Sequence, residues 1–272
     1  MAGLRKLEYR GYDSAGLAVL DSLSTIGVAR AAGKLDKLDD VLREHPLLGS
    51  VGVGHTRWAT HGHATVANAH PHVVGRVAVV HNGIIENYAA LRAELELRGR
   101  HFASETDTEV ISHLIDIELE EGAPTLLEAT RRALGRLHGS YAIAVVSGTE
   151  PGTIVVAKQF SPLVLGASGD ESYAASDVPA LLTHTRDVIY LEDGDIAELH
   201  SGVVHVERVD TIIASPEVNR PSTRVAWSPV EAERHGYKHF MLKEIFEQPA
   251  AIEATLRGRL LLSGCALDAA ET

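Results

Sequence analysis

The sequence predicts an α+β fold in which two antiparallel sheets are enclosed by helices. Two observations support this prediction. Three segments of helical composition lie in the first half of the chain, and short apolar runs separated by glycine, proline and aspartate fill the second half. Short runs joined by such residues are typical of antiparallel hairpins. With 272 residues, of which 45% are hydrophobic, the chain is long enough for one large domain or two small ones.

Apolar runs predict three strands in the first half of the chain. They lie at 16–20, 50–54 and 77–80. The third run is followed by His81, Asn82 and Gly83. We interpret this tripeptide as a tight turn, because Asn-Gly is a common turn signal.

Three helices are predicted between residues 86 and 137. The first, 86–98, is rich in Ala, Leu, Glu and Arg, and Gly99 is placed to end it. The second, 106–120, opens with Thr106 and Glu109 at the spacing of a capping box and continues with an apolar stripe at helical spacing. The third, 125–137, is expected to end near Gly139.

The second half of the chain is rich in predicted strands. They lie at 141–146, 153–157, 172–176, 187–191, 195–199 and 203–207. An extended connector is predicted over 215–236, which contains three prolines. The segment 237–249 is expected to be followed by a short helix and a polar tail.

Composition excludes several classes of protein. No run of 18 or more residues is apolar throughout, so we expect no transmembrane helix and no membrane partner. The first residues lack the apolar region of a signal peptide, and the single cysteine, Cys265, cannot form an internal disulfide, so we expect a cytoplasmic protein. The net charge of −12, without a long basic run, argues against nucleic acid as a partner.

The octet HTRWATHG at 55–62 follows a predicted strand and concentrates polar side chains at its end. Arg57 offers a planar fork that suits a carboxylate. Thr60 and His61 offer short-range hydrogen bonds, and Trp58 offers an apolar wall. Together these groups suit a small zwitterion better than a metal or a polymer, whereas each residue alone is equally compatible with an ion pair or a core position.

Two further stretches complete this hypothesis. A tight turn at Asn82 and Gly83 would present an amide side chain and a backbone N–H in one direction, as in an oxyanion hole. Asp107 lies in the first turn of a predicted helix, where it complements the helix dipole. Asp107 could instead pair with a substrate ammonium while Arg57 pairs with its carboxylate, which would hold an α-amino acid at both ends.

Six stretches, in this order and spacing, resemble the glutaminase domain of glutamine–fructose-6-phosphate aminotransferases, also called glucosamine-6-phosphate synthases. They are EYRGYDSAG (8–16), HTRWATHG (55–62), NAHPH (68–72), HNGIIEN (81–87), SETDTEV (104–110) and KEIFEQP (243–249). The resemblance implies the N-terminal-nucleophile hydrolase fold, an αββα sandwich over 1–249, with 250–272 starting a connector to a sugar-phosphate isomerase domain.

The resemblance also implies an activity and the residues that perform it. The domain would hydrolyse L-glutamine and pass ammonia to fructose 6-phosphate, without cofactor or metal, in a homo-oligomer. Arg57 would bind the α-carboxylate and Asp107 the α-amino group. Asn82 and Gly83 would form the oxyanion hole. Thr60, His61 and His70 would line the site. Trp58 would form a wall of the site, and Arg10 would help to order the nucleophile.

The nucleophile that the resemblance implies is an N-terminal cysteine, which uses its own α-amine as base. The sequence begins MAGLRKLEYRG, without that cysteine and without the family's opening strand, and Cys265 matches no nucleophile position. We therefore expect an N-terminally truncated domain that binds glutamine without hydrolysing it. We also expect an unpaired sheet edge where the opening strand belongs.

Two alternative functions remain open. Six histidines lie between residues 55 and 81, and two pairs of them are one residue apart, as in some metal sites. They are His55, His61, His63, His70, His72 and His81. However, no HExxH motif is present. The other alternative is a non-catalytic glutamine-binding domain, which would bind glutamine through Arg57 and Asp107 and release no ammonia.

Overall fold

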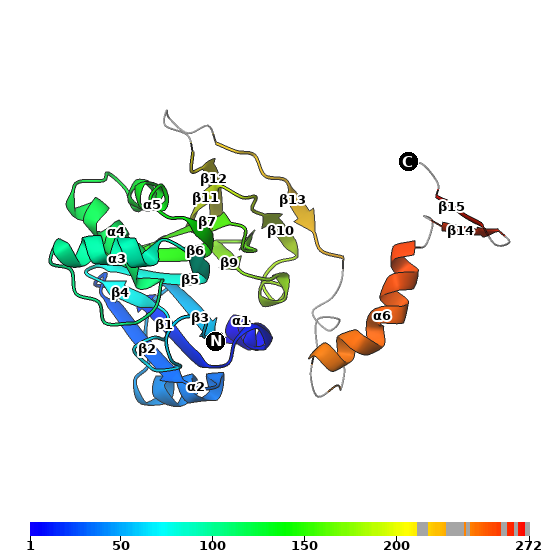
Figure 1. Ribbon diagram of the computed structural model, residues 1–272, viewed down its shortest axis with the longest axis horizontal. Coiled ribbons are helices and arrows are strands. Elements are labelled where there is room, and N and C mark those ends of the chain that lie inside the picture. Colours follow the sequence, from blue (N-terminus) through cyan, green and yellow to red (C-terminus); the bar gives the residue numbers. More distant parts are fainter. Residues whose placement is uncertain (211–216, 227–236, 238–239, 257–259, 264–265, 270–272) are drawn as a thin grey trace. The chain divides into compact units, whose positions relative to one another are not determined.

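A six-stranded antiparallel sheet organises the first part of the structure, a computed structural model (Figure 1). Its strand order is β12-β11-β7-β6-β5-β4. The strands are β4 (His72–Val74), β5 (Val77–Ile85), β6 (Gly139–Ser147), β7 (Thr153–Gln159), β11 (Asp195–His200) and β12 (Val203–Arg208). Neighbouring strands in sequence pair as hairpins, as the short spacing predicts.

The two faces of this sheet pack against different layers. Side chains alternate along β5, so Val77 and Val79 face one layer while Ala78 and Val80 face the other. Three helices cover the first face through a large apolar core. They are α3 (Tyr88–Leu97), α4 (Glu109–Glu120) and α5 (Leu126–Leu134). Gly99 ends α3 with a φ of +82°, as predicted.

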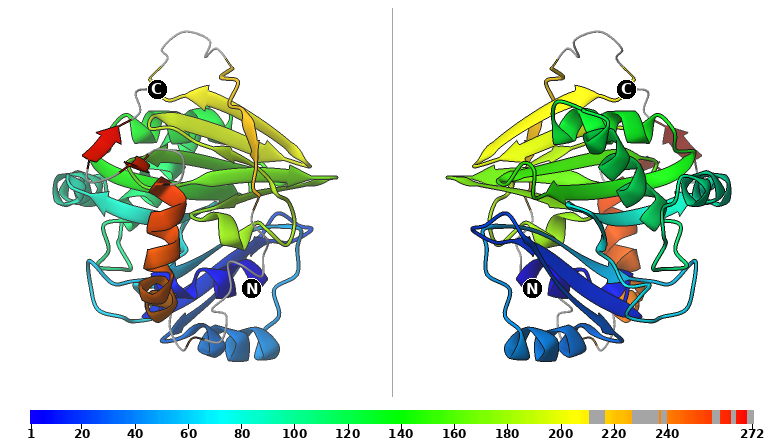
Figure 2. Two further views of the ribbon diagram at one scale, coloured as in Figure 1. Left: turned by 90° about the vertical axis from the view of Figure 1, so that its right-hand side faces the viewer. Right: turned by 90° about the vertical axis from the view of Figure 1, so that its left-hand side faces the viewer.

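A three-stranded antiparallel sheet, in the order β2-β1-β3, packs on the second face. It consists of β1 (Ser14–Leu20), β2 (Ile26–Ala32) and β3 (Val51–Arg57). Helix α2 (Leu35–Glu44) covers its outer side through Leu35 and Leu38. Figure 2 shows the resulting order of layers, with the green helices and the blue helix α2 on opposite sides of the two sheets. The predicted αββα arrangement is confirmed.

A further antiparallel sheet, absent from the prediction, covers the rest of the second face. Its order is β13-β10-β8-β9, and it packs through Leu163, Leu165 and Leu191 against β7, β11 and β12. The strands are β8 (Val164–Ser168), β9 (Glu171–Ala175), β10 (Asp187–Tyr190) and β13 (Ser222–Arg224). A short 3-10 helix, η2 (Val178–Ala180), lies between β9 and β10.

Two predictions about local structure near the site are wrong. His81, Asn82 and Gly83 form no turn but continue β5, where Asn82 pairs with Ala142 of β6. Helix α4 begins at Glu109 rather than Thr106, and Glu109 accepts hydrogen bonds from Ser104 instead of completing a capping box.

The structure describes residues 1–210, 217–226, 237, 240–256, 260–263 and 266–269, in two compact units, Met1–Ala226 and Trp227–Thr272. In the second unit, α6 (Phe240–Leu256) is one helix with Pro249 inside it, not a segment followed by a short helix. Strands β14 (Leu260–Ser263) and β15 (Ala266–Ala269) pair as a hairpin. Cys265 and most of the predicted connector lie outside the described residues. None of the described helices is long and apolar enough to cross a membrane.

Candidate functional site

All nine residues that the sequence singles out line one pocket, with a volume of about 100 Å³. They come from five separate stretches: the 3-10 helix η1 (Glu8–Arg10), the end of β3 with the loop after it, the segment before β4, the end of β5, and the segment before α4. They are Arg10, Arg57, Trp58, Thr60, His61, His70, Asn82, Gly83 and Asp107. The pocket therefore lies where β3 and β5, from the two facing sheets, approach the start of α4.

Five further residues line the same pocket and are absent from the predicted glutamine site, although two of them, His55 and His81, were candidate metal ligands. They are His55, Thr56, His81, Thr106 and Thr108. The alternation of β3 contained a signal for one of them, because Val53, His55 and Arg57 all point into the interior. A strand that places Arg57 at the pocket must also place His55 there.

The guanidinium of Arg57 is buried and orders the loop that follows β3. It donates to the carbonyl oxygens of His61, Gly62 and His63, the last at 3.1 Å. Burial lowers the pKa of Arg57, and the carboxylates of Asp13 and Asp107 oppose that shift. Three hydrogen bonds use at most three of its five N–H donors, so two stay available for a ligand.

The stretch EYRGYDSAG supports the end of β3. Gly11 lies so close to that strand that a Cβ atom there would be 2.6 Å from the carbonyl carbon of Arg57. Asp13 accepts a hydrogen bond from the backbone N–H of Ala59 at 2.7 Å. Arg10 lies at the pocket, 3.8 Å from Asp177, which also accepts a hydrogen bond from Tyr9. Residues of this motif therefore contact the backbone at the end of β3 and the start of the loop after it.

Asn82 faces β3 from the neighbouring sheet. Its Oδ1 lies 2.9 Å from Nε2 of His55. Gly83 has a φ of +138°, a conformation that L side chains rarely adopt. The amide of Asn82 and the backbone at Gly83 thus reach the pocket from within a strand, which holds them more firmly than the predicted turn would.

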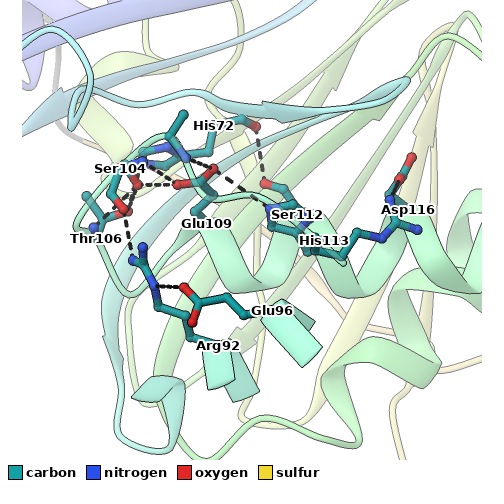
Figure 3. Close-up of polar contacts among 11 residues, drawn as sticks. His72, Arg92, Glu96, Ser104, Thr106, Glu109, Ser112, His113 and Asp116 are labelled. Carbon is teal, nitrogen blue, oxygen red and sulfur yellow. Dashed lines mark hydrogen bonds and ion pairs between the residues drawn. The ribbon is translucent and has the colours of Figure 1, made fainter. Parts of the chain in front are cut away.

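Asp107 is held at the start of α4. Its Oδ2 accepts a hydrogen bond from the backbone N–H of Ile85 at 2.8 Å. Its Oδ1 lies 3.9 Å from Nδ1 of His61. The segment before Asp107 is held by the buried carboxylate of Glu109, which accepts hydrogen bonds from the backbone N–H and the hydroxyl of Ser104 at 2.7 and 2.6 Å (Figure 3). These bonds help hold the pKa of Glu109 down at about 2, despite burial.

Four buried histidines lie together, and three of them, His55, His70 and His81, line the pocket. The rings of His55 and His70 are 4.3 Å apart, and those of His70 and His72 are 4.8 Å apart. Burial lowers the pKa of His55 to about 4 and that of His72 to about 3, and it also lowers the pKa of His70 and His81. All four are therefore neutral at pH 7. Among the described residues, no group of three His, Cys, Asp or Glu side chains is arranged to hold a metal ion.

The outer rim of the pocket is more exposed. Trp58 is 59% exposed, and its ring lies 5.5 Å from that of Tyr12. The ring of His61 lies 5.4 Å from that of Tyr88, at the start of α3. Trp58 and His61 thus bring aromatic surface to the rim of the pocket.

Comparison with known proteins points to one chemistry. A family described as a glutamine amidotransferase domain matches residues 55–183. The glutamine–fructose-6-phosphate aminotransferase of Symbiobacterium thermophilum is 52% identical over 100% of this chain and 45% of its own length. The enzyme of the same name from Streptomyces coelicolor is 51% identical, over 97% of this chain and 42% of its own length. The chain spans less than half the length of these relatives.

Solved structures agree with the fold. Glutamine phosphoribosylpyrophosphate amidotransferase from B. subtilis superposes with a TM-score of 0.65 and is 26% identical, over 77% of this chain and 46% of its own. A glutamine aminotransferase class-II domain protein from Silicibacter pomeroyi, 20% identical with a TM-score of 0.51, shows the same fold.

Proposed function

Because this chain carries a glutamine amidotransferase domain like that of glutamine–fructose-6-phosphate aminotransferases, we propose that its pocket binds L-glutamine. One observation carries the proposal. Nine residues expected to recognise or activate glutamine, scattered over nearly a hundred positions, line a single pocket.

The proposed binding mode uses both ends of the amino acid. Arg57 would receive the α-carboxylate with the donors that its loop carbonyls leave available. Asp107 would receive the α-ammonium at Oδ1, since Oδ2 is already bonded to Ile85. The side-chain amide would then extend toward Asn82 and Gly83. Opposite charges at fixed separation select an α-amino acid over a simple acid or amine.

The proposed reaction is hydrolysis of the side-chain amide. The α-amine of the cysteine would take the thiol proton, and the thiolate would add to the amide carbon while Asn82 and Gly83 stabilise the oxyanion. The protonated α-amine would return that proton to the departing NH₂ group, so that ammonia leaves, and water would then release glutamate from the thioester and restore the thiol. We propose that the whole enzyme passes this ammonia to fructose 6-phosphate, yielding glucosamine 6-phosphate, in a second domain. Homo-oligomerisation of that enzyme is part of the same proposal.

No cysteine lines the pocket in the described part of the chain. We therefore separate binding from turnover. Binding is proposed for the pocket that the described residues form, and turnover requires a thiol in addition to these residues.

Calorimetric titration with L-glutamine tests the proposal, with L-glutamate as the matched control. We expect saturable binding of glutamine and weaker binding of glutamate, because a second carboxylate would replace the neutral amide near Asn82. Ammonia release is measured on the same samples. Absence of glutamine binding would refute the proposal, whereas binding accompanied by ammonia release would refute the separation of binding from turnover.

A further inference from the structure

Asn68 links two segments that both contribute residues to the pocket lining, the loop after β3 and the segment before α4. Its side chain is almost fully buried. Nδ2 donates to the carbonyl oxygen of His63 at 3.0 Å and to Oε2 of Glu105 at 3.0 Å. Oδ1 accepts from the backbone N–H of Glu105 at 2.9 Å. One side chain therefore bonds to both the loop after β3 and the segment before α4.

These bonds fix the orientation of the amide group. Both N–H donors of Asn68 are used, each on an oxygen, and its oxygen receives an N–H. The reversed amide would place its oxygen against a carbonyl and a carboxylate, which repel it. Gly62 allows the amide this position, because a Cβ atom there would lie 2.7 Å from Nδ2 of Asn68.

Each bond leads to one of the two charged residues of the pocket. The carbonyl oxygen of His63 accepts from Asn68 and also from Arg57, at 3.0 and 3.1 Å. Glu105 is two residues before Asp107, whose carboxylate is held by Ile85. The hydrogen bonds of Asn68 and of the His63 backbone lower the pKa of Glu105. The path from Arg57 to Asp107 is thus continuous through hydrogen bonds and two peptide units.

We propose that Asn68 is a positioning residue that couples Arg57 to Asp107, so that the carboxylate and the ammonium of glutamine are recognised cooperatively. This inference rests on the proposed function of the pocket. Without Asn68, the segment that presents Asp107 is still held by Glu109, but fewer contacts join it to the Arg57 loop, among them the hydrogen bond of Glu105 to the His63 backbone. Recognition of the ammonium should therefore fail before recognition of the carboxylate.

The test compares two ligands, L-glutamine and 4-carbamoylbutanoate, which is glutamine without its α-amino group. The unaltered chain should prefer glutamine. In Asn68→Ala, the affinity for glutamine should fall about tenfold while that for 4-carbamoylbutanoate changes less than about twofold, as for residues coupled through one network. An unchanged preference, whether both affinities fall together or neither does, overturns the proposal.

Two further variants distinguish the positioning role of Asn68 from misfolding and indirect effects. Glu105→Ala alters an exposed residue and removes its side-chain bonds to Asn68 and to the His63 backbone, which join the same two segments, so it should lower the preference in the same direction. Thr65→Val is the matched control, because Thr65 Oγ1 accepts only from the backbone N–H of Asn68, at 3.3 Å, and does not reach the segment before α4. We expect the control to keep the preference.

A readout without ligand separates this inference from the proposed function. If the unaltered chain binds neither ligand, the proposed function fails, and hydrogen exchange at the Ile85 amide still reports the position of Asp107. Faster exchange in Asn68→Ala than in Thr65→Val supports the positioning role. Equal exchange rates overturn it.

Discussion

Replacement of Gly83 by alanine should strongly destabilise the first unit. Gly83 pairs with Tyr141 across β5 and β6 of the six-stranded sheet. Its φ of +138° disfavours any side chain, and a Cβ atom would lie 2.7 Å from the carbonyl carbon of Ser140 and closer still to its oxygen. The atoms in the way belong to the backbone of β6, so they cannot move aside without opening the sheet.

The magnitude has two parts. A non-glycine residue at unfavourable positive φ costs about 1–3 kcal/mol. Separation of the strands adds about 2 kcal/mol or more, because hydrogen bonds of the β5–β6 ladder are lost and their groups stay buried. We therefore expect Gly83→Ala to lower the free energy of unfolding by about 3–5 kcal/mol.

Gly99→Ala is the matched control. Gly99 also has a positive φ, +82°, but nothing lies within 4 Å of the position that a Cβ atom would take there. This variant should cost only about 1 kcal/mol, the conformational part alone. Urea unfolding of both variants measures the difference, with m unchanged. Equal losses of stability in the two variants would show that the close approach to Ser140 does not contribute to the cost of Gly83→Ala.

Three further outcomes are expected. Arg57→Ala should weaken glutamine binding by about 2–5 kcal/mol, measured by calorimetry, whereas the exposed Arg43→Ala should bind normally. The free energy of unfolding should fall as the pH is lowered from about 6.5 toward 4. The folded pKa values of His55 and His72, about 4 and 3, lie below the unfolded value, so the unfolded chain binds more protons in this range. Each histidine contributes a slope of up to about 1.4 kcal/mol per pH unit, and unfolding of His72→Gln at several pH values should show one such slope removed. Arg220→Ala should lower the free energy of unfolding in urea by about 2 kcal/mol, because the fully buried Asp195 loses two hydrogen bonds. Arg224→Ala removes an exposed ion pair with Asp187 and should cost less than about 1 kcal/mol. Equal costs would contradict the role of burial.

The layered fold could be predicted because its long helices and hairpin strands have clear periodic patterns. Helix α2 was missed although Leu35, Leu38, Val41 and Leu42 follow helical spacing, so its signal was present in the sequence. Strand β2 offered little signal, since its buried residues are the small Ala29 and Ala31. Its position depends on pairing with β1, a contact that local sequence does not encode.

The errors at the site have a common physical cause. Asn-Gly favours a turn locally, but pairing of β5 with β6 and the close approach of Ser140 hold Gly83 inside the sheet. Thr106 and Glu109 have capping-box spacing, but the carboxylate of Glu109 accepts from Ala103 and Ser104 instead. Contacts outside the local motif, across the sheet for Gly83 and within the preceding loop for Glu109, outweigh a local preference of about 1 kcal/mol.

The buried histidines explain how a strand residue can hold the orientation required of the oxyanion donor that we propose. Nδ1 of His55 is buried without a partner, so a proton there would be an unsatisfied donor. Since His55 is neutral at pH 7, its proton belongs on Nε2, which donates to Oδ1 of Asn82 at 2.9 Å. That bond turns the NH₂ group of Asn82 away from His55 and leaves it free to donate into the pocket. The lowered pKa of His55 and the orientation of Asn82 are therefore two consequences of the burial of His55. A polar residue of the three-stranded sheet thus sets the direction of an N–H donor in the six-stranded sheet.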